Sequence, residues 1–278
     1  MPAHRLIAWA AVNGRDLPWR HTRDPWAILV SEVMLQQTQV ARVIPVWRDF
    51  LDRFPTAPAC AAAPQADVVT AWRGMGYNRR AVSLHRCAIA VTADHAGVVP
   101  DDLDALLALP GIGPYTARAV LAFAYERPVG VLDVNAARVH ARLAGAPVDQ
   151  PRADAAAPVA EAWAWNQAIV DLGATICTKR QPRCGNCPLS GQCAWRGVGP
   201  DPAPTGTRQS KFEGSDRQGR GRLVNALRLG AVSADPADLA ETMGWPGDTE
   251  RAERVALSVV ADGLADWADN SLTLCLRQ

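Results

Sequence analysis

The chain has 278 residues and a net charge of +1, and 49% of its residues are hydrophobic while 21% are charged. This composition excludes a largely disordered protein, and the length allows one or two domains with a buried core. No apolar run reaches the roughly 20 residues that a membrane-spanning helix needs, so no membrane partner is expected. The N-terminus carries only a short apolar stretch between charges, which predicts a first helix rather than a secretion signal and a cytoplasmic location.

Most of residues 1–175 predict helix, because apolar residues recur there at spacings of three and four. The expected helices lie at 26–50, 78–92, 101–109, 114–125, 135–144 and 155–173. Pro and Gly fall where these helices should end. The sequence therefore predicts an all-α domain built from many short helices.

Glu32 interrupts the apolar run from Trp26 to Val40, on a predicted helix. A carboxylate in such a run is costly unless it is paired, or unless it serves acid–base chemistry with a raised pKa. A salt-bridged or edge-facing glutamate is the alternative interpretation, and these residues alone leave both open.

A Gly-rich turn with the sequence LPGIGPYTA separates two predicted helices at Leu109 to Ala117. Gly111 and Gly113 allow a tight turn whose backbone N–H groups point outward, beside the positive end of the following helix. This is the helix-hairpin-helix pattern, and it predicts a phosphate-binding site made of backbone.

Asp133 lies at the predicted start of the helix that follows, and Asn135 stands two residues later. On local grounds an N-cap role is the more ordinary interpretation of this aspartate. A capping residue can still face a cleft, so a catalytic role also stays open.

Four of the seven cysteines lie close together, at Cys177, Cys184, Cys187 and Cys193. This density predicts a metal or cluster site rather than disulfides. Structural zinc usually takes its thiolates as two close pairs, and only one pair is close here. A 4Fe-4S cluster is therefore expected, with zinc as the alternative.

The same loop carries three cations, Lys179, Arg180 and Arg183. A loop held by a cluster would present them as a rigid surface for DNA phosphates. A solvated charged loop is the alternative.

Residues 197–210 are rich in Pro, Gly and small polar residues and predict a linker. Beyond it, the expected elements are helices at 215–229, 236–244 and 249–263, a turn at Asp269–Asn270 and a strand within 271–276. These elements predict a winged-helix-like module, and a helical cap on the first domain is the alternative. The predicted domains are thus 1–196 and 211–278, joined by the linker 197–210.

The hairpin, Asp133 and the four-cysteine loop occur together and in this order, and they resemble the helix-hairpin-helix DNA glycosylase superfamily, which includes endonuclease III. Five segments are similar to those of the MutY-type adenine DNA glycosylases. They are DLPWR (16–20), SEVMLQQTQV (31–40), GMGY (74–77), LPGIGPYTARA (109–119) and WNQAIVDLGATIC (165–177). The resemblance spans residues 8–196.

The resemblance implies a six-helix barrel module, a cluster module with one 4Fe-4S cluster, and a monofunctional enzyme that excises adenine opposite 8-oxoguanine or guanine in double-stranded DNA. We expect it to act as a monomer. Glu32 matches the family's catalytic acid and Asp133 its catalytic aspartate, and Tyr115 and Asn135 match supporting positions. The substrate-binding positions are matched by Arg15, Leu17, Trp19 and Arg20 for the adenine pocket, by Gln167 for the adenine edge, and by Gln37, Thr38 and Tyr77 beside the lesion base.

Three alternatives to this activity follow from the residues. A bifunctional glycosylase/lyase like endonuclease III needs a lysine in the helix after the hairpin, but Tyr115 stands there and no lysine precedes Lys179. A thymine or uracil mismatch glycosylase of the same shape is a second alternative, although Glu32 within SEVMLQQTQ favours adenine. A catalytically silent DNA-binding module is the third, and the intact Glu32 and Asp133 argue against it.

The chain departs from the family pattern at three places. Asn78 stands where a second aromatic residue is usual, and Val134 where a smaller or polar residue is usual. The segment 211–278 is too short for the Nudix-like domain that reads 8-oxoguanine in well-known members.

Overall fold

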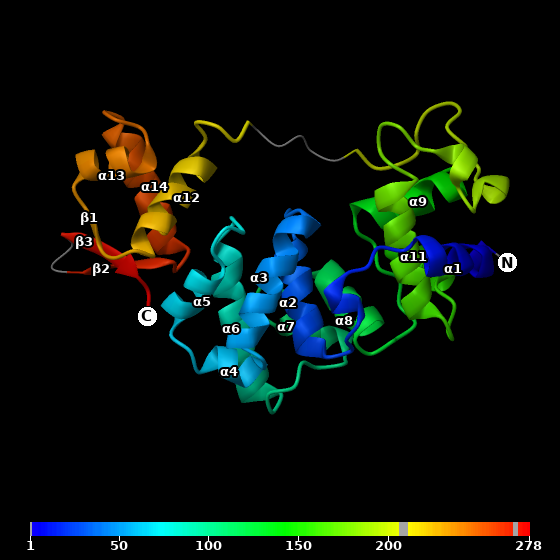
Figure 1. Cartoon of the computed structure of the whole chain (residues 1–278), viewed down its shortest axis with the longest axis horizontal. Coiled ribbons are helices and arrows are strands. Elements are labelled where there is room, and N and C mark those ends of the chain that lie inside the picture. The colour runs from blue at the N-terminus through cyan, green and yellow to red at the C-terminus, as the bar shows by residue number, and fades with distance from the viewer. Residues whose placement is uncertain (1, 206–210, 269–271) are drawn as a thin grey trace. The chain divides into compact units, whose positions relative to one another are not determined.

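The computed structural model describes residues 2–205, 211–268 and 272–278, and it is mostly helical (Figure 1). The chain forms two compact units. Unit 1 comprises Met1–Ile28, Asp101–Leu107 and Ile112–Arg208, and unit 2 comprises Leu29–Pro100, Ala108–Gly111 and Gln209–Gln278. No helix in the described part of the chain is long and apolar enough to cross a membrane.

Unit 1 is built around one central helix. Its elements are α1 (Pro2–Asn13), the short turn η1 (Pro18–Arg20), α8 (Pro114–Phe123), α9 (Val134–Ala144), α10 (Gln150–Ala156), α11 (Ala162–Thr175), and the short turns η2 (Cys184–Asn186) and η3 (Ser190–Gln192). Helix α11 packs against α1, α8 and α9. Its buried Trp165, Ile169 and Leu172 join Leu6 and Val139 in one apolar core, because residues three and four apart share a helix face.

The first part of unit 2 is a helical bundle. Its elements are most of α2 (Pro25–Leu35), α3 (Val40–Arg53), α4 (Ala57–Ala61), α5 (Gln65–Ala71) and α6 (Arg79–Asp94), and α7 (Leu103–Ala108) reaches this unit with its last residue. Helix α6 packs against α4 and α5, and α3 packs against α5. Phe50 and Trp72 meet edge to face in the core, with ring centroids 6.2 Å apart.

Unit 2 also contains a C-terminal module, residues 211–278. It consists of α12 (Asp216–Leu227), β1 (Val232–Ser233), α13 (Pro236–Met243), α14 (Thr249–Ala261), β2 (Ala265–Ala268) and β3 (Thr273–Leu276). The strands form an antiparallel sheet in the order β1-β3-β2, with Val232 opposite Leu274 and Ala265 opposite Leu276. The three helices pack on one another beside this sheet (Figure 1). This is the topology of a winged helix, which confirms the predicted fold of the module.

Two of the expected helices are each interrupted. The segment predicted at 26–50 divides into α2 and α3, because Gln37 adopts a left-handed backbone conformation with φ of 55° and ends the first helix. The segment predicted at 155–173 covers the end of α10 and most of α11, since Ala157 is extended at the end of α10. The strand β1 is an addition, because two residues are too few to give an alternating pattern.

The predicted domain boundaries at 196 and 211 stay predictions. Residues 206–210 of the predicted linker and the predicted turn at Asp269–Asn270 lie outside the described residues. Asp201, in the described part of the linker, accepts hydrogen bonds from Arg142 at 2.6 and 3.1 Å. The first part of the linker is therefore attached to α9.

Candidate functional site

Glu32 lies in unit 2 on helix α2 and is only 4% exposed. Its neighbours Ser31, Val33 and Met34 are buried as well, because α2 is apolar on nearly all of its faces. Asp24 accepts a hydrogen bond from the Trp26 N–H at 3.0 Å, which closes the first turn of the helix. The helix thus buries the carboxyl group of Glu32, and edge exposure is not its role.

Asp133 lies in unit 1 and caps helix α9. Its Oδ1 accepts hydrogen bonds from the backbone N–H groups of Asn135 at 2.9 Å and Ala136 at 2.6 Å. Its Oδ2 accepts one from the Asn135 side chain at 3.0 Å. The N-cap interpretation is therefore correct, and the three donors also fix the direction of the carboxylate.

The Asn135 side chain is held from two sides. Its Oδ1 accepts a hydrogen bond from Arg138 Nη2 at 2.8 Å. On the facing helix α11, a Cβ atom added to Gly173 would lie 2.8 Å from the Asn135 Cβ, so only glycine allows this approach. The glycine in the segment VDLGATIC is thus explained by the packing of the helix that carries Asp133.

Two buried arginines of α9 connect this site with the cysteine loop. Arg138 donates to the carbonyl groups of Gly173 at 2.7 Å and Cys177 at 2.8 Å. One turn further, Arg142 donates to the Thr178 carbonyl at 2.8 Å and to Cys177 Sγ at 3.3 Å. A continuous set of hydrogen bonds therefore runs from Asp133 through Asn135 and Arg138 to the first cysteine.

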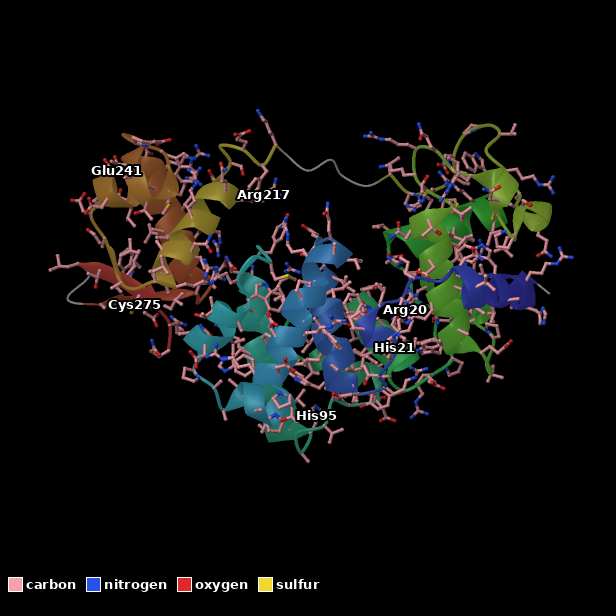
Figure 2. The ribbon with its side chains drawn as sticks, in the orientation of Figure 1. Arg20, His21, His95, Arg217, Glu241 and Cys275 are labelled. Carbon is pink, nitrogen blue, oxygen red and sulfur yellow. The ribbon has the colours of Figure 1, made fainter. Side chains whose placement is uncertain are left out.

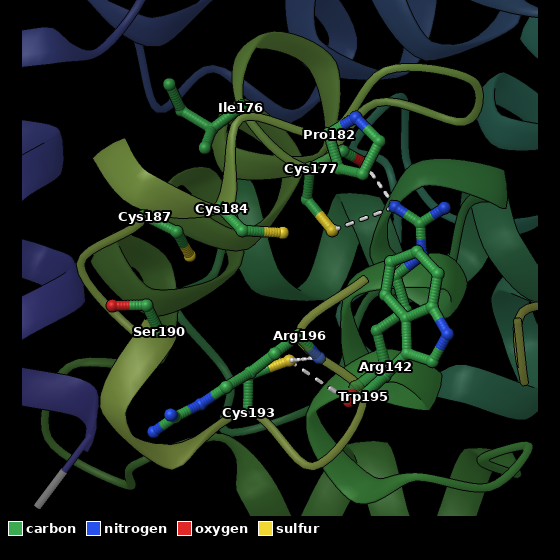
Figure 3. Close-up of a pocket in the computed structure, with 10 residues that line it drawn as sticks. All are labelled: Arg142, Ile176, Cys177, Pro182, Cys184, Cys187, Ser190, Cys193, Trp195 and Arg196. Carbon is green, nitrogen blue, oxygen red and sulfur yellow. Dashed lines mark hydrogen bonds between the residues drawn. The ribbon is translucent and has the colours of Figure 1, made fainter. Parts of the chain in front are cut away.

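The four predicted ligand cysteines line one pocket of unit 1 (Figure 3). They are Cys177, Cys184, Cys187 and Cys193, and each is half-buried. Burial raises the pKa of the Cys177 thiol, and the guanidinium group of Arg142 opposes that shift. The structure thus brings together the residues that the spacing selected.

The three cations of this loop are exposed. Lys179 and Arg180 extend from its surface, whereas Arg183 donates a hydrogen bond to the Thr175 carbonyl at the end of α11. Exposure agrees with a phosphate contact for all three, and the bond of Arg183 restrains its position.

The predicted adenine-pocket segment is fixed to α11 by a buried ion pair. Arg15 Nε lies 2.6 Å from Asp171 Oδ1, and Arg20 donates to both carboxylate oxygens at 2.7 and 2.8 Å. Burial alone would raise the pKa of Asp171, but its ion pairs with Arg20 and Arg15 outweigh that effect and lower the pKa. Leu17 and Trp19, which lie between the two arginines, are buried. The arginines therefore position this segment.

Gln37, Thr38 and Tyr77 line one cleft of unit 2. Gln37 and Tyr77 both have left-handed backbone conformations, with φ of 55° and 44°. Such conformations cost of order 1–3 kcal/mol for residues other than glycine and collect at functional sites. Two of the three residues predicted beside the lesion base are thus held in strained turns.

Arg80 holds both of these turns. It donates to the Gln36 carbonyl at 2.7 Å and to Thr38 Oγ1 at 2.9 Å on one side, and to the Gly76 carbonyl at 3.3 Å on the other. Burial lowers the pKa of Arg80 to about 10, so the guanidinium group stays charged at neutral pH. Its charge strengthens each of these hydrogen bonds.

The fold requires glycine at only one of the two hairpin positions. Gly111 has φ of 78°, and a Cβ added there would lie 2.6 Å from the Ser83 Cβ on α6. Gly113 caps α8 in an extended conformation, and a Cβ added there would meet nothing within 4 Å. Gly111 is therefore needed by the fold, whereas the space in front of Gly113 is open to a ligand.

Tyr115 and Gln167 are half-buried residues of unit 1, on the first turn of α8 and on α11. Next to Gln167, the buried Asn166 accepts a hydrogen bond from the Val131 N–H at 2.9 Å and donates to the Val129 carbonyl at 2.8 Å. It thereby fixes the extended segment that leads to Asp133.

Sequence reasoning missed Asn166, Arg138, Arg142, Arg80 and the role of Asp171. Four of them are charged residues at positions where the helical pattern expects apolar ones, which is the signal that would have found them. Asn166 is detectable only through its neighbours in the segment WNQAIVDLG.

Comparisons with known proteins identify the family of the chain. The family model described as "HhH-GPD superfamily base excision DNA repair protein" matches residues 30–164. The adenine DNA glycosylase of Mycobacterium tuberculosis is 47% identical over 271 residues, covering 93% of this chain and 88% of the relative. That of Mycolicibacterium smegmatis is 44% identical, covering 94% and 91%.

A solved structure of a thermostable thymine-DNA glycosylase is 29% identical, with a TM-score of 0.67, and the likeness covers 70% of this chain and 94% of that one. The match in fold and the identity over most of the chain agree. The chain therefore belongs to the adenine DNA glycosylase family, within the HhH-GPD superfamily of base excision DNA repair proteins.

Proposed function

We propose that this chain is a monofunctional DNA glycosylase that hydrolyses the bond between adenine and deoxyribose where adenine stands opposite 8-oxoguanine or guanine, and leaves an abasic site. The observation that carries the proposal is the buried Glu32 carboxyl group on an otherwise apolar helix, in a chain that keeps Asp133. The identity with the mycobacterial adenine DNA glycosylases supports it.

Glu32 supplies the proton in this reaction. Adenine leaves deoxyribose poorly unless a purine nitrogen is protonated, so the enzyme needs a carboxylic acid in a water-poor environment. The carboxyl group of Glu32 has that environment. Protonation of the base lets the C1′–N9 bond break with both electrons going to adenine.

Asp133 stabilises the sugar cation that remains when the base has left. Loss of the base leaves an oxocarbenium-like sugar, and a nearby carboxylate stabilises such a cation, as paired carboxylates do in glycoside hydrolysis. The three N–H donors around Asp133 hold its oxygens in one direction before the charge develops. Water then adds to C1′ and its proton restores the acid.

The target base must first leave the helical stack, which costs a few kcal/mol. We assign the offsetting contacts to Gln37, Thr38 and Tyr77, in the turns that Arg80 fixes, and to the backbone N–H groups at Gly113. The contacts of Lys179, Arg180 and Arg183 with phosphates add affinity without reading sequence.

The monofunctional character follows from the absence of a suitable amine. A lyase reaction needs an amine that adds to C1′ of the sugar. The chain has two lysines, Lys179 in the cysteine loop and Lys211 after the linker, and Tyr115 stands at the position that the lyase family gives to lysine. We therefore assign β-elimination no part in the reaction.

We further propose that Cys177, Cys184, Cys187 and Cys193 hold one 4Fe-4S cluster. The four thiols line one pocket, and only one pair of them, Cys184 and Cys187, is close in the sequence. This spacing fits a multi-iron cluster, with one thiolate per iron corner, better than one zinc ion. When bound, the cluster supplies structural order to the loop that carries Lys179 and Arg180.

Iron analysis tests this assignment. The purified protein should be brown and contain about four irons per chain, as a cubane cluster requires. A colourless protein with one zinc would reject the cluster. Cys187→Ser should empty the loop and weaken DNA binding, because the cationic loop would lose its scaffold.

The activity is tested by single-turnover excision from duplexes with adenine opposite 8-oxoguanine, guanine or cytosine. Excision opposite 8-oxoguanine and guanine, and not opposite cytosine, is expected. Duplexes with thymine or uracil opposite guanine form the second arm, because the fold is also that of a thymine-DNA glycosylase. Removal of thymine instead of adenine would replace the proposal. We propose a monomer that acts in the cytoplasm.

A further inference from the structure

The C-terminal module has a built interface with the helical bundle of unit 2. Arg228, at the end of α12, donates to the Val69 carbonyl at 2.9 and 3.1 Å and to Asn78 Oδ1 at 2.9 Å. Gln65 donates to the Gly263 carbonyl at 2.7 Å in a buried contact. The module is therefore fixed against α5 and the turn before α6.

Asn78 is a residue of this interface that the sequence already marks as unusual. It is one of the places where the chain departs from the family pattern, and its side chain is 6% exposed. Burial lowers the pKa of Arg228 to about 10, so the guanidinium group that Asn78 accepts from is charged at neutral pH. Asn78 thus contributes a side-chain acceptor to the interface with the C-terminal module.

A cleft of about 1070 Å³ runs along this interface. One wall is made by the turns at 36–39 and 74–78, including Gln37 and Tyr77. The other wall comes from the module, through Phe212 and residues of α12. Its lining includes one carboxylate, that of Asp262, and six arginines, which are Arg42, Arg79, Arg80, Arg217, Arg220 and Arg228.

The charges of this cleft do not cancel. Arg80 and Arg228 are used in holding the turns and the interface. Asp262 pairs with Arg220 and lies 3.7 Å from Arg79. Arg217, which projects from α12 (Figure 2), donates to the Tyr77 hydroxyl at 3.0 Å, and Arg42 is exposed. One carboxylate thus faces several cations at the mouth, and the cleft attracts an anion.

The helix that a winged-helix module usually inserts into DNA is unsuited to that role here. Helix α14 exposes Glu250 and Glu253. Its Arg251 and Arg254 are paired with Asp216, at 2.7 and 3.0 Å. A phosphate backbone would be repelled by this face, so α12 is the cationic side of the module.

The chemistry of the cleft fits an unpaired nucleotide with its phosphates. Tyr77 and Phe212 are 40% and 57% exposed, and the guanidinium group of Arg217 lies 5.7 Å from the centroid of the Phe212 ring, so aromatic rings and a cation meet at the surface of the cleft. Aromatic faces combined with cations are how proteins bind single-stranded nucleic acid. The Gln37 side chain adds an amide that pairs with base edges.

We propose that α12 of the C-terminal module forms the second wall of the site for the DNA strand opposite the target adenine, with Arg217 contacting a phosphate and Phe212 stacking with the unpaired base. This rests on the proposed function, because removal of adenine from the stack is what leaves the opposite base unpaired.

The test is the affinity of the full chain for a duplex with 8-oxoguanine opposite an adenosine analogue that resists cleavage, measured by fluorescence anisotropy over a range of salt concentrations. Arg217→Ala should raise Kd about tenfold near 0.1 M salt and reduce the slope of log Kd against log salt by about 0.9, the effect of one phosphate contact. Arg254→Ala removes the same charge from α14 and should change Kd less than about twofold, because its exposed ion pair contributes little.

Phe212→Ala should raise Kd at least about fivefold, and this effect should vanish when the opposite nucleotide is an abasic site, since no base is left to stack. If Arg217→Ala has the slope and Kd of Arg254→Ala, the α12 assignment is overturned. A Phe212→Ala effect that persists on the abasic duplex overturns the stacking contact. Adenine excision by the unaltered enzyme is measured separately. Its absence would reject the proposed function, and the binding measurements would still test the contacts of Arg217 and Phe212.

Discussion

Replacement of Arg138 by methionine tests the connection between Asp133 and the cysteine loop. Methionine has a similar length and keeps the buried volume, but it donates no hydrogen bond. The change leaves the Asn135 side-chain oxygen and the carbonyl groups of Gly173 and Cys177 without this donor. Arg138 itself is 8% exposed, so water replaces it poorly.

The magnitude follows from these three contacts. Hydrogen bonds to a charged donor contribute about 1.5–3 kcal/mol each, and they are not additive, so we expect a loss of about 3–5 kcal/mol. In a chain of this size that corresponds to a fall in Tm of about 5–9 °C. Asn135 would also lose its restraint on Asp133, and excision should slow at least about tenfold, since small misplacements of a reacting group are costly.

The assays are thermal unfolding and single-turnover excision at saturating enzyme. Arg138→Lys keeps the charge but reaches fewer of the three acceptors, so its Tm should lie between that of the unaltered chain and that of Arg138→Met. Arg152→Met, at an exposed position on α10, is the matched control and should leave both quantities nearly unchanged. A Tm and an excision rate for Arg138→Met equal to those of the control would refute the reasoning.

Four further substitutions have expected outcomes. Asp171→Asn should lower the free energy of unfolding by about 3 kcal/mol at pH 7, because two arginines lose a buried partner. The folded pKa of Asp171 is lowered, so its stabilisation is present above about pH 4 and is lost as pH falls through the folded value, and the difference from wild type should vanish in acid. Gly111→Ala should cost about 2–4 kcal/mol in denaturant unfolding, whereas Gly113→Ala should cost less than about 1 kcal/mol and weaken DNA binding instead. Tyr115→Lys should introduce borohydride trapping and strand nicking that the unaltered enzyme lacks, and nicking as fast as base release by the unaltered enzyme would contradict the monofunctional assignment.

The sequence predicted best what depends on local pattern. The helices at 78–92, 114–125 and 135–144, the Asp133 cap and the grouping of four cysteines follow from periodicity, capping chemistry and spacing, all of which act over short ranges. The winged-helix module was predictable because its leucine alternation marked a strand after three helices.

The remainder depends on contacts between distant segments. Arg80, Arg138 and Asp171 are charged residues that each have partners 35–156 positions away along the chain, so no local pattern identifies these contacts. The left-handed turn at Gln37 was missed for a similar reason. Arg80 holds this conformation by donating to the Gln36 carbonyl before the break and to the Thr38 hydroxyl after it, and the residue's own preference does not favour it.

Single-turnover excision by the unaltered chain and by Glu32→Gln tests the central claim most directly. Both are assayed on a duplex with adenine opposite 8-oxoguanine. Glutamine keeps the size and hydrogen bonding of Glu32 but carries no acidic proton, so excision should fall at least about 10²-fold while mismatch binding survives. Near-normal excision by Glu32→Gln would place the acid elsewhere, and no adenine release by the unaltered chain would contradict the assigned activity.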